Sequence, residues 1–166
     1  MQQTINEQVL DSTTHEIDHF KKFHDGRRGI ALEIEWNNKD PFYDRDLSNF
    51  SRLHLIGAIS AGIIITRGPS LQKALRSVFM AHYKSLEPSE LQKAIATVRE
   101  PHLSRIRKAA TSGERADLVA SVKASSKYGQ ATTHWTKLLA RIDRGLGNPC
   151  PLLLVGIEET RLQADR

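Results

Sequence analysis

The sequence has few of the features that mark secreted, membrane-bound or disulfide-stapled proteins. Its 166 residues include one cysteine, Cys150, so no disulfide can form within the chain and a reducing compartment is expected. No apolar run approaches the roughly 18 residues of a membrane span. The polar N-terminus also lacks the pattern of a secretory signal. We therefore expect a soluble, cytoplasmic protein with no membrane partner.

The charge balance is mildly basic. Lys and Arg number 24 against 19 Asp and Glu, which gives a formal net charge of +5. Such a surface attracts polyanions, of which nucleic acid is the simplest. The length suits one domain with a sizeable core, and no repeat or composition shift marks a second one.

The most informative stretch is residues 29–47, GIALEIEWNNKDPFYDRDL, in which Glu33 and Glu35 stand two apart in an apolar run. Successive side chains of a strand point to opposite faces, so both acids share a face with Ala31. The opposite face carries Ile30, Leu32, Ile34 and Trp36. We expect this apolar face to form the core and the acidic face to be left free for a site.

A hairpin is predicted before this stretch. Asp25-Gly26 favours a two-residue turn between strands over residues 15–23 and 29–36. In that register Asp18 lies opposite Glu33 and Glu16 lies opposite Glu35, with Cβ atoms about 5 Å apart. Facing carboxylates repel, so the cluster would hold a hard cation such as Mg²⁺ or have shifted pKa values. The alternative is that one or more of these acids simply face solvent.

The remaining pattern predicts alternating strands and helices. A helix capped by Asp44 or Asp46 ends near Gly57, and the apolar run 59–66 reads as a buried strand parallel to 29–36. Residues 1–13 favour a helix, residues 70–98 have helical spacing, and residues 86–126 are expected to form a basic helical insertion. A helix capped by Thr132 or Thr133 precedes a last strand over 151–157.

The basic stretch has two interpretations, a solvated helical insertion or an arm that faces DNA. Its cations are Arg99, Arg105, Arg107, Lys108, Arg115, Lys123 and Lys127.

A competing motif lies in the hairpin. His15-Glu16-Ile17-Asp18-His19 fits H-E-x-x-H, the helical zinc motif of metalloproteases. The Asp-Gly turn and strand that follow, and the lack of a third ligand at a familiar spacing, disfavour a zinc metalloprotease.

Several strings together indicate a known family. Asp18 followed by Glu33-Ile34-Glu35 resembles the D…(D/E)-x-K nuclease signature, with Glu35 where many members have Lys. The strings EIEWNNKDPFYDRDL, ISAGIIITRG at 59–68, ATTHW and PLLLVGI resemble the BglII group of type II restriction endonucleases. The resemblance implies a single restriction-endonuclease-like domain over 1–166, an α/β fold whose mixed β-sheet is flanked by helices. Such enzymes usually carry a longer helical portion before the residue that corresponds to Asp18.

The resemblance also implies a mechanism, the Mg²⁺-dependent hydrolysis of DNA phosphodiester bonds. Asp18 and Glu33 would hold the metal ion, with the Ile34 carbonyl as a further ligand. Glu35 cannot supply the positive charge of a Lys, so it would act as a general base or bind a second metal ion.

The bases of DNA would be read by loops beside the acidic residues Asp18, Glu33 and Glu35. The candidate DNA-binding residues are Asn37, Asn38, Lys39, Arg67, Tyr128, Gln130, Thr132, Thr133 and His134. A simple Asn-rich turn is the alternative at Asn37-Asn38. The family analogy implies a homodimer acting on a short palindrome of double-stranded DNA, with a GATC core, and a cognate DNA methyltransferase as genetic partner. The alternative is a truncated DNA-binding remnant that cleaves nothing.

Overall fold

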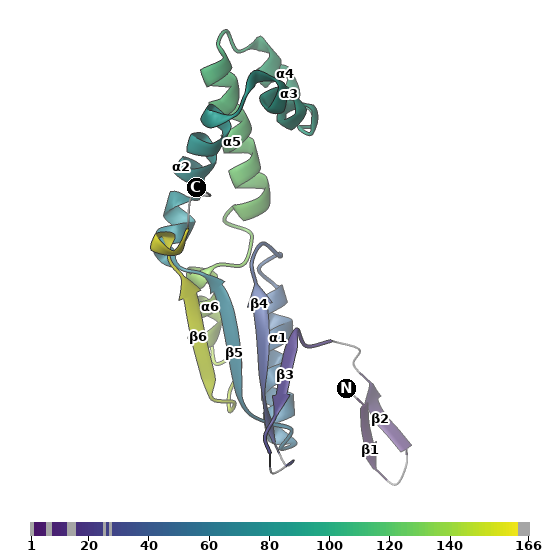
Figure 1. Ribbon diagram of the computed structural model, residues 1–166. Helices are drawn as coiled ribbons and strands as arrows, with labels where there is room; N and C mark the ends of the chain where they lie inside the picture. Colours follow the sequence, from purple (N-terminus) through teal and green to yellow (C-terminus); the bar gives the residue numbers. More distant parts are fainter. Residues whose placement is uncertain (1, 6–7, 13–15, 25, 27, 163–166) are drawn as a thin grey trace.

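The computed structural model describes residues 2–5, 8–12, 16–24, 26 and 28–162 (Figure 1). A four-stranded sheet lies at its centre, in the order β3 (His19–Lys22), β4 (Gly29–Glu35), β5 (Ile59–Arg67) and β6 (Leu152–Ile157). Strand β3 is antiparallel to β4, whereas β4, β5 and β6 are parallel. The predicted α/β class, a mixed sheet flanked by helices, is confirmed.

The register of the predicted hairpin is also confirmed. His19 pairs with Leu32 and Lys22 pairs with Gly29. Beyond the strand ends, the Phe23 amide donates to the Arg28 carbonyl at 2.8 Å. Asp25 lies outside the described residues, so the predicted turn type at Asp25-Gly26 stays a prediction.

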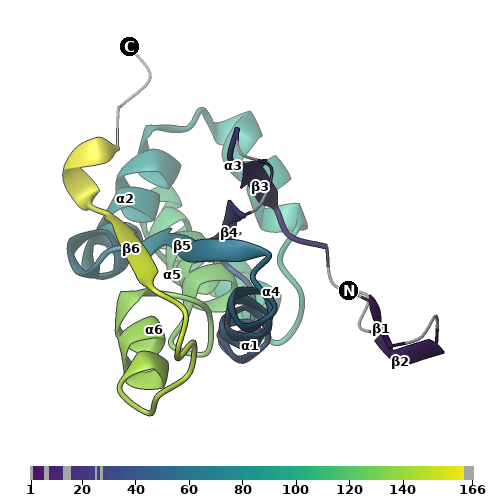
Figure 2. The same cartoon turned by 90° about the horizontal axis from the view of Figure 1, so that it is seen from below.

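Two helices cover one face of the sheet. Helices α1 (Phe42–Leu55) and α6 (Trp135–Ile142) lie on the same side when the sheet is seen along its strands (Figure 2). Their apolar stripes pack on the strands to form the main core, since such stripes are buried against a sheet. This core contains Ala31, Tyr43, Leu47, Phe50, Ile59, Ile64, Leu138 and Cys150.

The expectation for the two faces of β4 is wrong. The covered face is the one with Ala31, Glu33 and Glu35, all of which are buried, whereas Ile34 on the opposite face is 42% exposed. The physical reason is that α1 and α6 both pack on the Ala31 side, where Ala31 and Gly62 leave room for the Phe50 ring. The carboxylates therefore lie at the rim of the core.

The remaining helices form a second body, here called the helical arm, which extends past the carboxyl ends of the parallel strands (Figure 1). It consists of α2 (Pro69–Ser85), α3 (Pro88–Ala96), α4 (His102–Lys108) and α5 (Ser112–Tyr128). Its own apolar core contains Leu91, Ile95, Val98, Ile106, Ala116 and Val119. Helices α3, α4 and most of α5 lie within residues 86–126, the stretch for which an insertion was predicted.

Three local predictions are wrong. Pro41 and His134, rather than Asp44, Asp46 or the threonines, precede α1 and α6, and neither makes a side-chain cap. Asp44 instead accepts a hydrogen bond from Arg141 at 3.0 Å. Within residues 1–13, β1 (Gln2–Ile5) and β2 (Gln8–Ser12) are antiparallel strands rather than a helix, because three apolar positions are too few to define a helical stripe.

A short 3₁₀ helix, η1 (Glu159–Arg161), follows β6. Among the described residues, none of the helices has the length and apolar composition needed to cross a membrane.

Candidate active site at the carboxyl edge of the sheet

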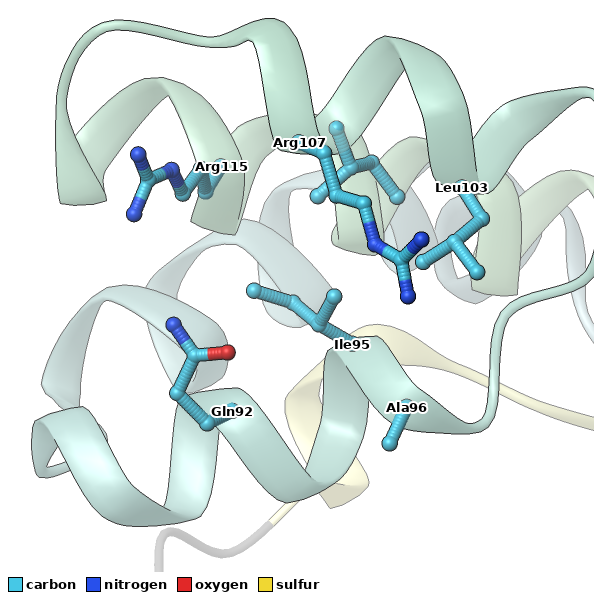
Figure 3. A pocket seen from close by; sticks show the side chains of 7 residues that line it. Gln92, Ile95, Ala96, Leu103, Arg107 and Arg115 are labelled. Atoms are coloured by element: carbon cyan, nitrogen blue, oxygen red, sulfur yellow. The ribbon is translucent and has the colours of Figure 1, made fainter.

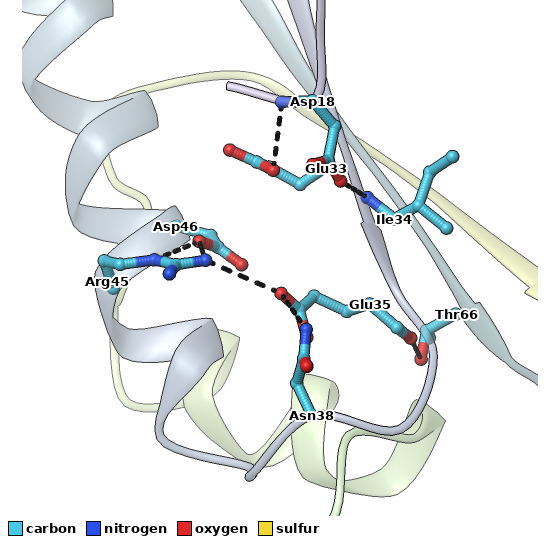
Figure 4. A network of polar contacts seen from close by, with 8 residues as sticks. All are labelled: Asp18, Glu33, Ile34, Glu35, Asn38, Arg45, Asp46 and Thr66. Carbon is cyan, nitrogen blue, oxygen red and sulfur yellow. Dashed lines mark hydrogen bonds and ion pairs between the residues drawn. The ribbon is translucent and has the colours of Figure 1, made fainter. Parts of the chain in front are cut away.

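The hairpin brings Asp18 and Glu33 together near the end of β4, and these two residues with Glu35 are here called the acidic edge. Asp18 Oδ2 accepts a hydrogen bond from the Ile34 amide at 2.8 Å, and the Asp18 amide donates to Glu33 Oε2 at 3.4 Å (Figure 4). Asp18 is exposed, whereas Glu33 is 2% exposed. The pair thus consists of one solvent-exposed carboxylate and one carboxylate at the rim of the core.

The predicted pairing of Glu16 with Glu35 is not formed. Strand β3 begins at His19, so its ladder stops before Glu16, which is exposed. The acid beside Glu35 is instead Asp46 of α1, which is fully buried. Asp46 lies on the stripe of Tyr43 and Phe50 that faces the sheet, as residues three and four apart on a helix do.

Glu35 has a crowded polar environment. Its oxygens accept hydrogen bonds from Asn38 Nδ2 at 3.3 and 3.1 Å, and Arg45 lies 3.7 Å away (Figure 4). Arg45 also binds Asp46 at 2.7 Å. Burial, and then the charge of Asp46 and a hydrogen bond with it, raise the pKa of Glu35 to about 8. Without a cation, Glu35 therefore holds a proton at neutral pH.

The end of β4 is fixed by a buried hydroxyl chain. Thr66 Oγ1 on β5 donates to the Glu35 carbonyl at 2.7 Å, and Tyr43 OH lies 2.7 Å from the same Thr66 oxygen. These bonds satisfy polar groups in the core and hold the backbone that carries Glu35.

The two predicted DNA-reading loops form one surface. The Thr133 amide donates to the Asn38 carbonyl at 2.9 Å, and the Asp40 amide donates to the Ala131 carbonyl at 3.1 Å. Between these bonds, Lys39 and Thr132 form an antiparallel bridge. The loop after β4 and the loop after α5 are therefore paired through their backbones.

The candidate DNA-binding residues divide into two sets. Asn37, Asn38, Lys39 and Gln130 are exposed, and Tyr128 is half-buried. The buried set is Arg67, Thr132, Thr133 and His134. Burial, followed by the nearby charge of Arg67, lowers the pKa of His134, which is therefore neutral at pH 7. The exposed set is open to solvent, whereas the buried set supports the loops from within.

The carboxylate donors suit a hard cation. Asp18 and Glu33 offer only oxygen atoms, the ligand type that Mg²⁺ prefers. Within the part of the chain that the structure describes, no three His, Cys, Asp or Glu side chains converge as a metal cluster. Main-chain oxygen and water would therefore complete any coordination by this pair. The rival zinc motif fails at His19, which lies in a strand rather than a helix, while His15 falls outside the described residues.

A pocket of about 230 Å³ lies elsewhere, in the helical arm (Figure 3). It is lined by Ile95 and Leu103 with Gln92, Arg107 and Arg115 around them. It is built from α3, α4 and α5 and shares no lining residue with the acidic edge.

Sequence reasoning missed Asp46, Arg45 and Thr66 as parts of this edge. Asp46 could have been found from its spacing to Tyr43 and Phe50, which places it on the buried side of α1. Thr66 could have been found from the parallel pairing, which sets it beside Glu35.

Comparison with protein families supplies the identity of the fold. The family model of restriction endonuclease BglII/BglIII matches residues 1–157, which include every residue of the acidic edge. No curated protein and no solved structure matches the chain. The chain belongs to the BglII/BglIII restriction endonuclease family, and it is a type II restriction endonuclease, a hydrolase of DNA.

Proposed function

We propose that this endonuclease cleaves double-stranded DNA by a Mg²⁺-dependent reaction in which Asp18, Glu33 and Glu35 are the catalytic residues. The observation that carries the proposal is the contact of Asp18 with Glu33 and Ile34 at the edge where β4 ends. Family membership supports DNA as the substrate and a divalent metal ion as cofactor.

Asp18 and Glu33 would hold the ion through their carboxylate oxygens, with the Ile34 carbonyl as a further ligand. The bound ion would polarise the scissile phosphate and lower the pKa of the attacking water. Asp18 is the exposed member of the pair and would be the one that faces a phosphate, whereas buried Glu33 would fix the position of the metal ion. Water would attack phosphorus as the bond to the 3′ oxygen breaks, the proton of the water would pass to Glu35 or to solvent, and the leaving 3′ oxygen would take a proton from solvent.

Glu35 would accept the proton of the water or bind a second cation. Its hydrogen bonds from Asn38 and the nearby guanidinium of Arg45 stabilise its anionic form, whereas burial and Asp46 oppose it. These opposed influences make the proton of Glu35 easy to displace when a cation arrives, as a group near neutrality should be for acid–base work.

The exposed residues of the paired loops would read bases. Amide side chains bind adenine through two hydrogen bonds in the major groove, and Asn37 and Asn38 carry such groups at the mouth of the acidic edge. Lys39 and Gln130 extend the same surface. We further propose a homodimer that cuts both strands of a short palindrome with a GATC core, in the cytoplasm, beside a cognate methyltransferase.

The experiment is incubation of the purified protein with unmethylated phage DNA, with and without Mg²⁺. Discrete fragments that appear only with Mg²⁺ are expected from the wild type, and none from Asp18→Asn. The exposed Asp143→Asn is the matched control and should cut normally. DNA binding without cleavage under all metal conditions would contradict the proposal and support a non-catalytic DNA-binding protein.

A further inference from the structure

Arg67 occupies an unusual position for a cation. It is the last residue of β5, and its side chain is fully buried. Burial lowers its pKa because the charged form has lost its water. Within the described residues, its hydrogen-bond acceptors are neutral oxygens rather than carboxylates.

These acceptors come from separate segments of the chain. Nε donates to the Trp36 carbonyl, at the start of the loop after β4, at 2.7 Å. One terminal nitrogen donates to Thr132 Oγ1 at 2.8 Å and to the Thr133 carbonyl, in the loop after α5. The other donates to Gln72 of α2 and, at 3.4 Å, to the Tyr128 carbonyl at the end of α5.

The surrounding contacts close this network. Gln72 Nε2 donates to the same Tyr128 carbonyl at 2.9 Å, and the guanidinium lies 5.0 Å from the Tyr128 ring centroid. One side chain thus joins the sheet, the base of the helical arm and both exposed loops. A planar guanidinium with five fixed donors can span these groups, whereas the single ammonium of Lys cannot.

A buried charge without a carboxylate partner is costly, and here hydrogen bonds to neutral oxygens offset that cost. The guanidinium also fixes the positions of the groups that it binds. It sets the spacing between the Trp36 carbonyl and Thr132–Thr133, and the backbone bonds of Asn38 and Asp40 to Thr133 and Ala131 follow from that spacing.

We propose that Arg67 is a positioning residue for sequence recognition, which locks the two loops into one base-reading surface without touching DNA itself. This rests on the proposed function of the loops. Arg67 fixes where Asn37, Asn38 and Gln130 stand relative to one another. A loose surface would still bind the phosphates through exposed cations such as Lys39, because phosphate attraction does not depend on base sequence.

The test compares wild type with Arg67→Lys and Thr132→Val. Thr132→Val is the milder variant, since it removes one acceptor of Arg67, together with the hydrogen bond that the Thr132 hydroxyl donates to the Gly129 carbonyl, and keeps the shape of the side chain. The matched control is Ile59→Val, at the other end of β5, which removes a buried methylene far from the loops. Hydrogen exchange of the Asp40 and Thr133 amides measures loop pairing without DNA.

A library of random duplexes measures recognition through the sequences that are cut and bound. For Arg67→Lys and Thr132→Val we expect faster exchange at Asp40 and Thr133. We also expect about a tenfold or larger loss of preference for the selected sequence, with non-specific binding and its salt dependence unchanged. Ile59→Val should lower thermal stability and leave both readouts as in wild type.

Unchanged exchange and unchanged sequence preference in a folded Arg67→Lys would overturn the proposal. So would equal weakening of all sequences, which is what a direct phosphate contact predicts. If the wild type selects and cuts no sequence at all, the proposed function fails, and the exchange of Asp40 and Thr133 then decides separately whether Arg67 locks the loops.

Discussion

The carboxyl edge of the sheet and the helical arm bury opposite kinds of side chain. The edge buries Glu33, Glu35, Asp46 and Arg67, whereas the core of the helical arm consists of apolar residues such as Ile106 and Val119. Burial of charged and polar groups costs stability unless each is well bonded, and burial of apolar groups supplies it. The edge therefore has the composition of a chemical site and the arm that of a support.

The surface ion pairs of the helical arm are also consistent with a supporting role. Its ion pairs, Lys84 with Asp117 at 2.9 Å and Lys93 with Glu90 at 2.6 Å, are largely exposed. Such pairs contribute about 1 kcal/mol at most. Changes at the edge should thus alter chemistry more than folding, and changes in the core of the arm should do the reverse.

The largest effect is expected at the edge. Glu33→Gln keeps the shape of the side chain and removes one negative charge among buried acids. Cleavage should fall roughly a thousandfold, since metal-assisted stabilisation of the transition state is worth several kcal/mol. The unfolding temperature should stay the same or rise. Cleavage rates on plasmid DNA and thermal unfolding curves measure the two quantities, with the exposed Glu90→Gln as control. Near-normal cutting by Glu33→Gln would show that Glu33 is not part of the site.

The arm should give the opposite result. Ile106→Ala leaves a cavity in the second core and should lower the free energy of unfolding by about 3 kcal/mol. Cleavage per folded molecule should change little at a temperature where the variant is folded. Urea unfolding and cleavage assays measure the two quantities. A large loss of cleavage in a fully folded Ile106→Ala would mean that the arm takes part in the chemistry.

Glu35 should make the metal-free protein less stable as pH rises. Its folded-state pKa is about 8, above the ordinary 4.5, so the folded chain holds a proton that the unfolded chain loses. The stability from this proton is fully present below about pH 4.5 and is lost as pH rises through about 8, an effect of up to about 4 kcal/mol. Urea unfolding between pH 5 and 8.5 measures it, and Glu35→Gln should flatten the slope. A slope equal to that of wild type would place the titration elsewhere.

The smallest effect is expected at Asn38. Asn38→Ala removes a candidate base contact and the hydrogen bonds to Glu35. Discrimination at one base pair should fall by about 1 to 3 kcal/mol, with non-specific binding unchanged. Competition between duplexes at one salt concentration checks this. An equal loss of affinity for all sequences would mean that Asn38 contacts the phosphate backbone of DNA rather than a base.

The fold was largely predictable because its signals are local. The alternation around Glu33, the apolar run of β5 and the spacing of α6 each predict their elements. The turn predicted from Asp-Gly implies the register that β3 and β4 have, and this register brings Asp18 to Glu33. These patterns depend on neighbours a few residues apart.

The face of β4 that becomes core was not predictable in this way. It depends on which side α1 and α6 pack, and an apolar face with Ile34 was the natural choice over one with two glutamates. The roles of Asp46 and Arg67 depend on partners far along the chain, since Arg67 bonds to Thr132 and Thr133. Local spacing carries no signal for such contacts.

The central claim is that the acidic edge binds a divalent cation for catalysis. The most direct measurement is the thermal unfolding of wild type and Glu33→Gln, each with and without Mg²⁺ and in the absence of DNA. A ligand that binds only the folded state raises the unfolding temperature. We expect Mg²⁺ to raise it in wild type, more strongly at pH 8 than at pH 6 because Glu35 loses its proton, and to leave Glu33→Gln unchanged. An equal rise in both proteins would contradict the claim.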